Sequence, residues 1–184
     1  IQVFTRTVPG SNFEEFEART TVNAPVESVV ALIKDMAACP NWIDTCILGK
    51  TLKQISENEF INYTINEAPW PVSNRDAVVR TTITRQGNSN TVLIRTIGLP
   101  EFIPEVDGLV RVKMIDASWR LTSIDETTTT VVYRVHNDPG GSLPSWLVNS
   151  AAVYQPFNTM KNLHDAVTHA KYHHEKDQVE CNGR

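Results

Sequence analysis

Residues 140–167, GGSLPSWLVNSAAVYQPFNTMKNLHDAV, decide the fold of this chain. Two glycines end whatever precedes them, Ser142 can accept bonds from the free amides at a helix start, and Pro144 suits a first helical turn. Large apolar residues then recur at helical spacing. No other helical segment is long enough to cover so wide a stripe, so the sequence predicts that strands cover it. The stripe consists of Trp146, Leu147, Ala151, Val153, Tyr154, Phe157, Met160 and Val167.

The rest of the chain alternates polar and apolar residues, which is typical of half-buried strands. A helix is expected from Pro25 with Asn23 as its cap, and a turn or short helix over residues 35–44. Hairpin connections between strands indicate an antiparallel sheet. The prediction is therefore an α+β fold, a curved antiparallel β-sheet wrapped around a long C-terminal α-helix. The expected strands are residues 13–22, 47–55, 59–66, 75–85, 91–97, 110–122 (with a bulge near Met114) and 127–137.

Length and composition favour one domain with a real core. The chain has 184 residues, and the prediction assigns residues 1–170 to a single domain and residues 171–184 to a polar C-terminal tail. A net charge of -4 argues against a nucleic-acid partner. No run approaches about 18 apolar residues, so a soluble protein is expected. The chain begins at Ile1 rather than methionine, which indicates that upstream residues were removed; the bacterial periplasm and cytoplasm both stay open.

The cysteines do not form a disulfide framework. Their number is odd, with Cys39, Cys46 and Cys181. Cys39 and Cys46 are close enough in sequence to pair, but two free thiols are the favoured interpretation. Their spacing fits no zinc pattern.

Two motifs resemble those of the START family of lipid-transfer domains, within the helix-grip superfamily. They are PWPVSNRD at residues 69–76 and DPGGSLPSWLVN at residues 138–149, and IQVFTR at residues 1–6 is a weaker likeness. The resemblance covers roughly residues 1–170. It implies a helix-grip fold, a tunnel for a sterol, phospholipid or other apolar ligand, and a transient contact with a membrane surface.

Arg75 is the main polar candidate. Arg75 and Asp76 are adjacent on a strand and must point to opposite faces, with Arg75 on the apolar side. A buried arginine needs a partner, which is either a ligand head group or a carboxylate such as Glu67. In sterol-carrying members of the family an acidic residue on the neighbouring strand matches the motif arginine. Thr64 stands there in this chain, which argues against a sterol.

Further residues could line the tunnel, although aromatic residues at strand positions are also typical of a plain core. Residues 99–109 carry large apolar side chains; the resemblance implies a lid, and a loop packed permanently on the core is the alternative. The polar face of Asn62, Thr64 and Asn66 meets either solvent or a wet tunnel wall. The expected ligand-binding residues are Arg75, Thr64, Tyr63, Phe102, Trp119, Tyr133, Tyr154 and Phe157.

Catalytic patterns are missing from the sequence. It has no H-E-x-x-H, no G-x-S-x-G and no glycine-rich phosphate loop, so no catalytic residue, metal or cofactor is predicted. The favoured function is binding, with possible transfer, of a hydrophobic small molecule such as a lipid. One alternative is a cyclase/aromatase-type enzyme with Asp116, Glu67 or His136 as its acid or base. Another is an interaction module whose chamber is filled by its own side chains.

Overall fold

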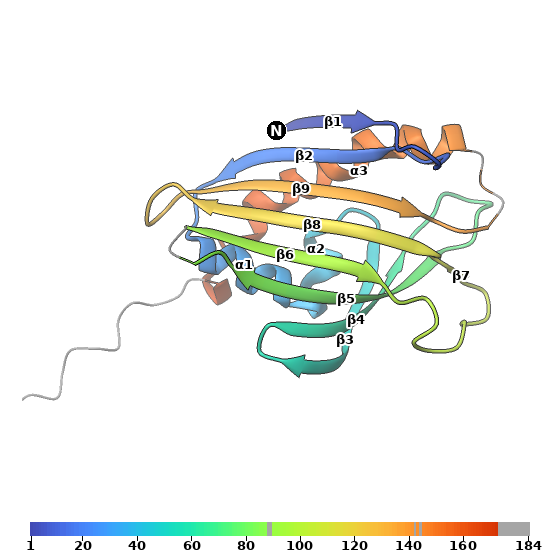
Figure 1. The fold of residues 1–184 in the computed structure, drawn as a ribbon, viewed down its shortest axis with the longest axis horizontal. Helices are drawn as coiled ribbons and strands as arrows, with labels where there is room; N and C mark the ends of the chain where they lie inside the picture. Colours follow the sequence, from blue (N-terminus) through green and yellow to red (C-terminus); the bar gives the residue numbers. More distant parts are fainter. Residues whose placement is uncertain (88–89, 142, 144, 173–184) are drawn as a thin grey trace, which may run out of the picture.

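A computed structural model describes residues 1–87, 90–141, 143 and 145–172. Within them nine strands form one curved sheet in the order β1-β2-β9-β8-β6-β5-β4-β3, with β7 beside β5 (Figure 1). Neighbours on the main path are antiparallel, and β7 pairs with β5 in parallel. The strands are β1 Gln2–Arg6, β2 Glu15–Val22, β3 Cys46–Ser56, β4 Glu59–Asn66, β5 Arg75–Arg85, β6 Thr91–Gly98, β7 Val110–Arg111, β8 Met114–Ser123 and β9 Thr129–Asp138.

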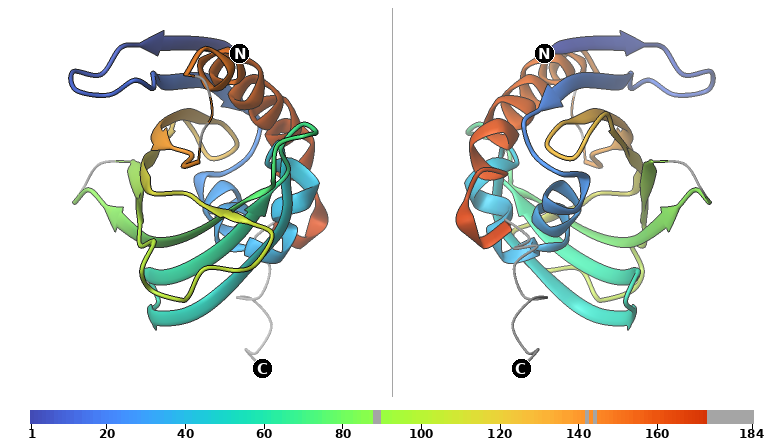
Figure 2. Two further views of the ribbon diagram at one scale, coloured as in Figure 1. Left: turned by 90° about the vertical axis from the view of Figure 1, so that its right-hand side faces the viewer. Right: turned by 90° about the vertical axis from the view of Figure 1, so that its left-hand side faces the viewer.

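Helices lie on the concave side of the sheet. Viewed from its ends, the sheet curves around, and α3 runs along the side that the sheet leaves open (Figure 2). It contacts β1, β2 and α2, while α2 contacts β3. The predicted α+β fold with a curved sheet around a C-terminal helix is confirmed. The helices are α1 Val26–Lys34, α2 Cys39–Trp42 and α3 Ser145–Ala166, with short 3-10 turns η1 Met36–Ala38 and η2 Ala170–Tyr172.

The solid core lies at one end of the sheet, under the C-terminal half of α3. Met160, Leu163 and Val167 are completely buried there. They meet α1 and the inner faces of the central strands. Each large aliphatic side chain buried in this way stabilises the fold by about 1.5–3 kcal/mol. This half of α3 therefore holds the helix on the sheet.

The N-terminal half of α3 differs from the prediction. Trp146 is 70% exposed and Tyr154 72% exposed, and Val153 and Phe157 are also on the surface. The inward side carries small or polar residues, because this half of the helix borders a cavity instead of a packed core. The apolar stripe is thus buried at Met160 and Val167 only among its described side chains. The predicted cap, Ser142 and Pro144, and the side chains of Leu147 and Ala151 lie outside the described residues.

Two local predictions were wrong. Asn23 does not cap α1, because the helix begins after Pro25 and no side chain bonds its first amides. Residues 110–122 are not one bulged strand. The segment pairs first with β5, as β7, and then changes partner to β6 and β9, as β8.

The domain packs at least as far as Tyr172. This residue belongs to the predicted tail, but it is buried, and its hydroxyl donates to Asp35 Oδ2 at 2.8 Å. Two effects raise the pKa of Tyr172 to about 12: burial is the larger, and the hydrogen bond to this carboxylate is the smaller. Lys171 pairs with the same carboxylate. Residues 171 and 172 are thereby fastened to the C-terminal end of α1.

Cys39 and Cys46 form a disulfide, so the prediction of two free thiols was wrong. The chain turns back sharply between α2 and β3, which brings the two Cα atoms to 6.0 Å. That separation suits a disulfide. The bond ties α2, whose Trp42 is buried in the core, to the edge strand β3.

Replacing both cysteines with serine is expected to lower the free energy of unfolding by about 2–3 kcal/mol, as expected for a cross-link that closes a short loop. Urea denaturation of the wild type with and without reductant should give the same difference. Cys181→Ser, which keeps this disulfide, is the matched control. Equal midpoints for the double variant and the control would contradict the prediction.

Candidate functional site

A cavity of about 600 Å³ lies between the concave face of the sheet and the N-terminal half of α3. Strands β2, β8 and β9 supply an apolar wall, and β4, β5 and β6 supply a largely polar wall. Helix α3 closes the cavity with Val148, Asn149, Ala152, Tyr154, Gln155, Pro156 and Thr159. The cavity is large enough for a small organic ligand.

Stacked aromatic rings form the centre of the apolar wall. The rings of Trp119 and Tyr133 stack with centroids 3.7 Å apart. Trp42 extends this row at 5.7 Å from Trp119, and Phe16 meets Tyr133 edge-on at 5.4 Å. Burial raises the pKa of the Tyr133 phenol, so it stays neutral. This wall presents flat apolar surface to whatever occupies the cavity.

Arg75 is an uncompensated cation in this cavity. Its residue is 8% exposed, its Nη1 donates to the Ser73 carbonyl, and its Nε has no partner among the described residues. No carboxylate of the described chain lies within ion-pair distance, so the alternative pair with Glu67 is not formed. Burial lowers the pKa of Arg75, because the charged form has lost water without gaining an anion. The guanidinium can therefore receive an anionic group.

A tight turn lies directly over Arg75. Gly140 and Gly141 both have positive φ, 70° and 69°, which favours glycine. A Cβ at Gly140 would lie 2.7 Å from the Arg111 carbonyl oxygen, and one at Gly141 would lie 3.8 Å from Arg75 Nη2. The glycines let the turn approach both arginines closely.

A hydrogen-bonded row of side chains crosses the polar wall, and we call it the polar row. Thr51 donates to Asn62 Oδ1 at 3.0 Å, and Asn62 Nδ2 donates to Thr81 Oγ1 at 3.3 Å. Thr81 and Thr96 share a bond at 3.3 Å. Asn62, Thr81 and Thr96 line the cavity. The predicted polar face of β4 is thus the cavity wall, and Thr64 lies on it with Asn66 donating to its hydroxyl.

A second network lies on the opposite face of the sheet. Arg111 donates to both carboxylate oxygens of Asp76, at 3.0 and 2.9 Å, and Tyr63 donates to Oδ2 at 3.1 Å. The side chains of this ion pair are 3% and 1% exposed. Arg111 also donates to the carbonyls of Pro100, Ile103 and Pro104. These bonds fasten residues 99–109 to the sheet and favour a fixed loop over a lid.

The expected ligand-binding residues separate into two groups. Arg75, Thr64, Trp119, Tyr133 and Tyr154 line the cavity. The other three, Tyr63, Phe102 and Phe157, do not. Tyr63 packs on the far face of the sheet, Phe102 lies in the fixed loop, and Phe157 points outward from α3.

The candidate acids and bases of the enzyme hypothesis are also separated. Glu67 lies at the cavity. Asp116 is exposed and pairs with Arg95 at 2.9 Å, and His136 Nε2 bonds Ser11 Oγ at 3.0 Å. Both lie on the face of the sheet that points away from the cavity, since their sequence neighbours line it.

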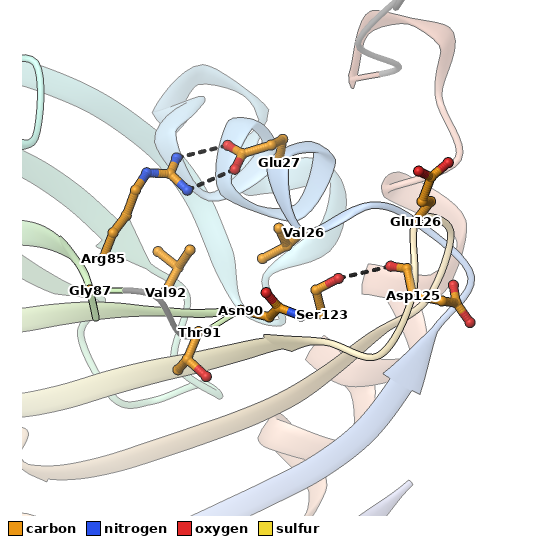
Figure 3. A pocket seen from close by; sticks show the side chains of 10 residues that line it. All are labelled: Val26, Glu27, Arg85, Gly87, Asn90, Thr91, Val92, Ser123, Asp125 and Glu126. Atoms are coloured by element: carbon orange, nitrogen blue, oxygen red, sulfur yellow. Dashed lines mark hydrogen bonds and ion pairs between the residues drawn. The ribbon is translucent and has the colours of Figure 1, made fainter.

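A smaller hollow of about 430 Å³ lies near the N-terminal end of α1 (Figure 3). Arg85 pairs there with both carboxylate oxygens of Glu27, at 2.7 and 2.8 Å, and Ser123 donates to the Asp125 carbonyl. Arg85 and Glu27, which both line this hollow, are therefore already paired with each other.

In the described residues, no three His, Cys, Asp or Glu side chains gather as a metal site would require, and no helix is long and apolar enough to cross a membrane.

Comparison with known proteins identifies the fold and the family. The chain is 36% identical to an uncharacterized protein of Pseudomonas aeruginosa over 90% of this chain and 81% of that one. Mouse phosphatidylcholine transfer protein is 33% identical over 59% of this chain, and the match covers about half of that protein's length. Human START domain-containing protein 10 is 24% identical over 78% of this chain and likewise matches about half of its length.

A solved structure agrees with the described geometry. The STAR-related lipid transfer protein from Xanthomonas axonopodis superposes with a TM-score of 0.83 at 34% identity, covering 90% of this chain and 92% of that one. The START domain family matches residues 1–175. Since that match spans almost the whole sequence, the chain belongs to the START domain family.

Proposed function

We propose that this protein binds a lipid in the cavity between the sheet and α3 and carries it between membranes, with Arg75 at the head group. The proposal is supported by the family and by relatives whose names describe lipid or phosphatidylcholine transfer. The observation that carries it is the buried, uncompensated guanidinium of Arg75 at the cavity. A lipid head group would supply the missing anion, and the aromatic wall would hold the apolar body.

The outer side of α3 is the proposed membrane contact. Trp146, Val153 and Phe157 follow one another at helical spacing and are all exposed. Exposed aromatic and aliphatic groups in one patch are typical of a surface that meets a partner or a lipid interface. Because α3 also closes the cavity, contact here would place the ligand beside the membrane.

Native mass spectrometry of gently purified protein is expected to detect a co-purifying lipid, and fluorescent fatty acid should bind with one-to-one stoichiometry. Trp146→Ser is expected to slow lipid transfer between vesicles severalfold without changing equilibrium binding, because the residue does not line the cavity. Ile124→Ser, on an exposed apolar residue outside α3, is the control. Absence of both a bound lipid and any fatty-acid uptake would contradict the proposed function.

A further inference from the structure

We infer that the ligand is an acidic amphiphile with an oxygen-bearing group part-way along its apolar chain. This inference rests on the proposed function and narrows its ligand class. Two observations carry it: the number of protons in the polar row, and the position of that row relative to Arg75.

The polar row contains one hydroxyl proton that has no acceptor among the described residues. Thr81 accepts a bond from Asn62, and a single further bond joins Thr81 to Thr96. The two threonines bring two hydroxyl protons, and this shared bond uses one of them. Among the described residues no acceptor for the second proton is found. Both hydroxyls lie at the cavity, so one O–H remains available to an oxygen of the ligand.

The polar row and Arg75 lie on one line. Arg75, Ala77, Val79 and Thr81 follow one another along β5 and all line the cavity. Six residues of strand separate Arg75 from Thr81, which is roughly 20 Å at about 3.3 Å per residue. The arginine side chain shortens the gap. An extended chain with its acid at Arg75 would reach Thr81 and Thr96 well beyond its middle.

Oleate and ricinoleate make a direct test, because they differ by one hydroxyl group placed beyond the middle of the chain. Titration calorimetry is expected to show ricinoleate binding about five- to tenfold more tightly, as one added hydrogen bond would give. The double variant Thr81→Val with Thr96→Val keeps the side-chain volumes, removes both hydroxyl groups and should bring the ratio of the two affinities close to one. Thr82→Val, which changes an exposed threonine on the same strand, should leave the ratio unchanged.

Further probes test the acid. Neutral monooleoylglycerol should bind at least tenfold more weakly than oleate, and comparison of oleate with oleoyl lysophosphatidate shows whether the acid is a carboxylate or a phosphate. A wild-type ratio of one, a ratio that survives the double valine variant, or strong binding of the neutral probe overturns the inference while leaving the proposed function intact. Failure of all probes to bind overturns both.

Discussion

Asp76→Ala is expected to lower the free energy of unfolding by about 3–5 kcal/mol, because it leaves the Arg111 guanidinium buried without its carboxylate. Both side chains are almost completely buried, and Tyr63 loses its acceptor as well. Since Arg111 also holds three carbonyls of residues 99–109, the loop should loosen together with the sheet. Urea denaturation measures the first effect, and amide hydrogen exchange in the loop measures the second.

Asp116→Ala is the matched control for this pair. Its partner Arg95 and Asp116 itself are both more than half exposed, so the loss should stay within about 1 kcal/mol. The double variant Asp76→Ala with Arg111→Met should lose less free energy of unfolding than the two single variants lose together, since no buried charge remains. A loss below about 1 kcal/mol for Asp76→Ala would mean that the network is not the anchor described above.

Arg75→Met is expected to change stability and binding in opposite directions. The empty protein should gain about 1–2 kcal/mol, because a buried charge without a counter-ion is replaced by an apolar chain. Affinity for an acidic lipid should fall about 10- to 100-fold, as follows from the loss of a charged hydrogen bond. Thermal unfolding without ligand and calorimetric titration with oleate measure the two quantities separately.

The control for this arginine is Arg80→Met on the same strand. Arg80 is half exposed and pairs with Glu59 at the surface, so neither stability nor oleate affinity should change appreciably. If Arg75→Met lowered both stability and affinity, Arg75 would be a structural residue of the turn at Gly140, and the head-group proposal would fail.

Local patterns predicted most of the sheet. Alternation placed residues 75–85 on a strand, and β5 has those bounds. The same alternation set Arg75 on the inner face, and Thr81 shares that face, so the polar row could have been found from the periodicity of β5. The order of strands and helices also came from these local patterns, and the motifs around Arg75 and Gly140 added the family resemblance.

Other features depended on contacts that no local pattern encodes. Arg111 is an isolated arginine in a strand segment, and its partner Asp76 lies 35 residues earlier. The helical stripe of α3 showed which residues are apolar, but its direction depends on whether a packed core or a cavity lies opposite. Pairing of Cys39 with Cys46 depended on the sharp return of the chain after α2, which the sequence left open.

The two halves of helix α3 differ in how much apolar surface they bury. Its last turns bury Met160 and Leu163, whereas its earlier turns face the cavity with groups such as Asn149 and Gln155, which water solvates readily. Exposing the cavity-facing side of the N-terminal half to water has a small free-energy cost, whereas exposing the buried side of the C-terminal half has a large one. We therefore expect the N-terminal end of α3 to detach from the sheet first, while its C-terminal end stays packed on the core. The helix would then turn about a point beyond Pro156.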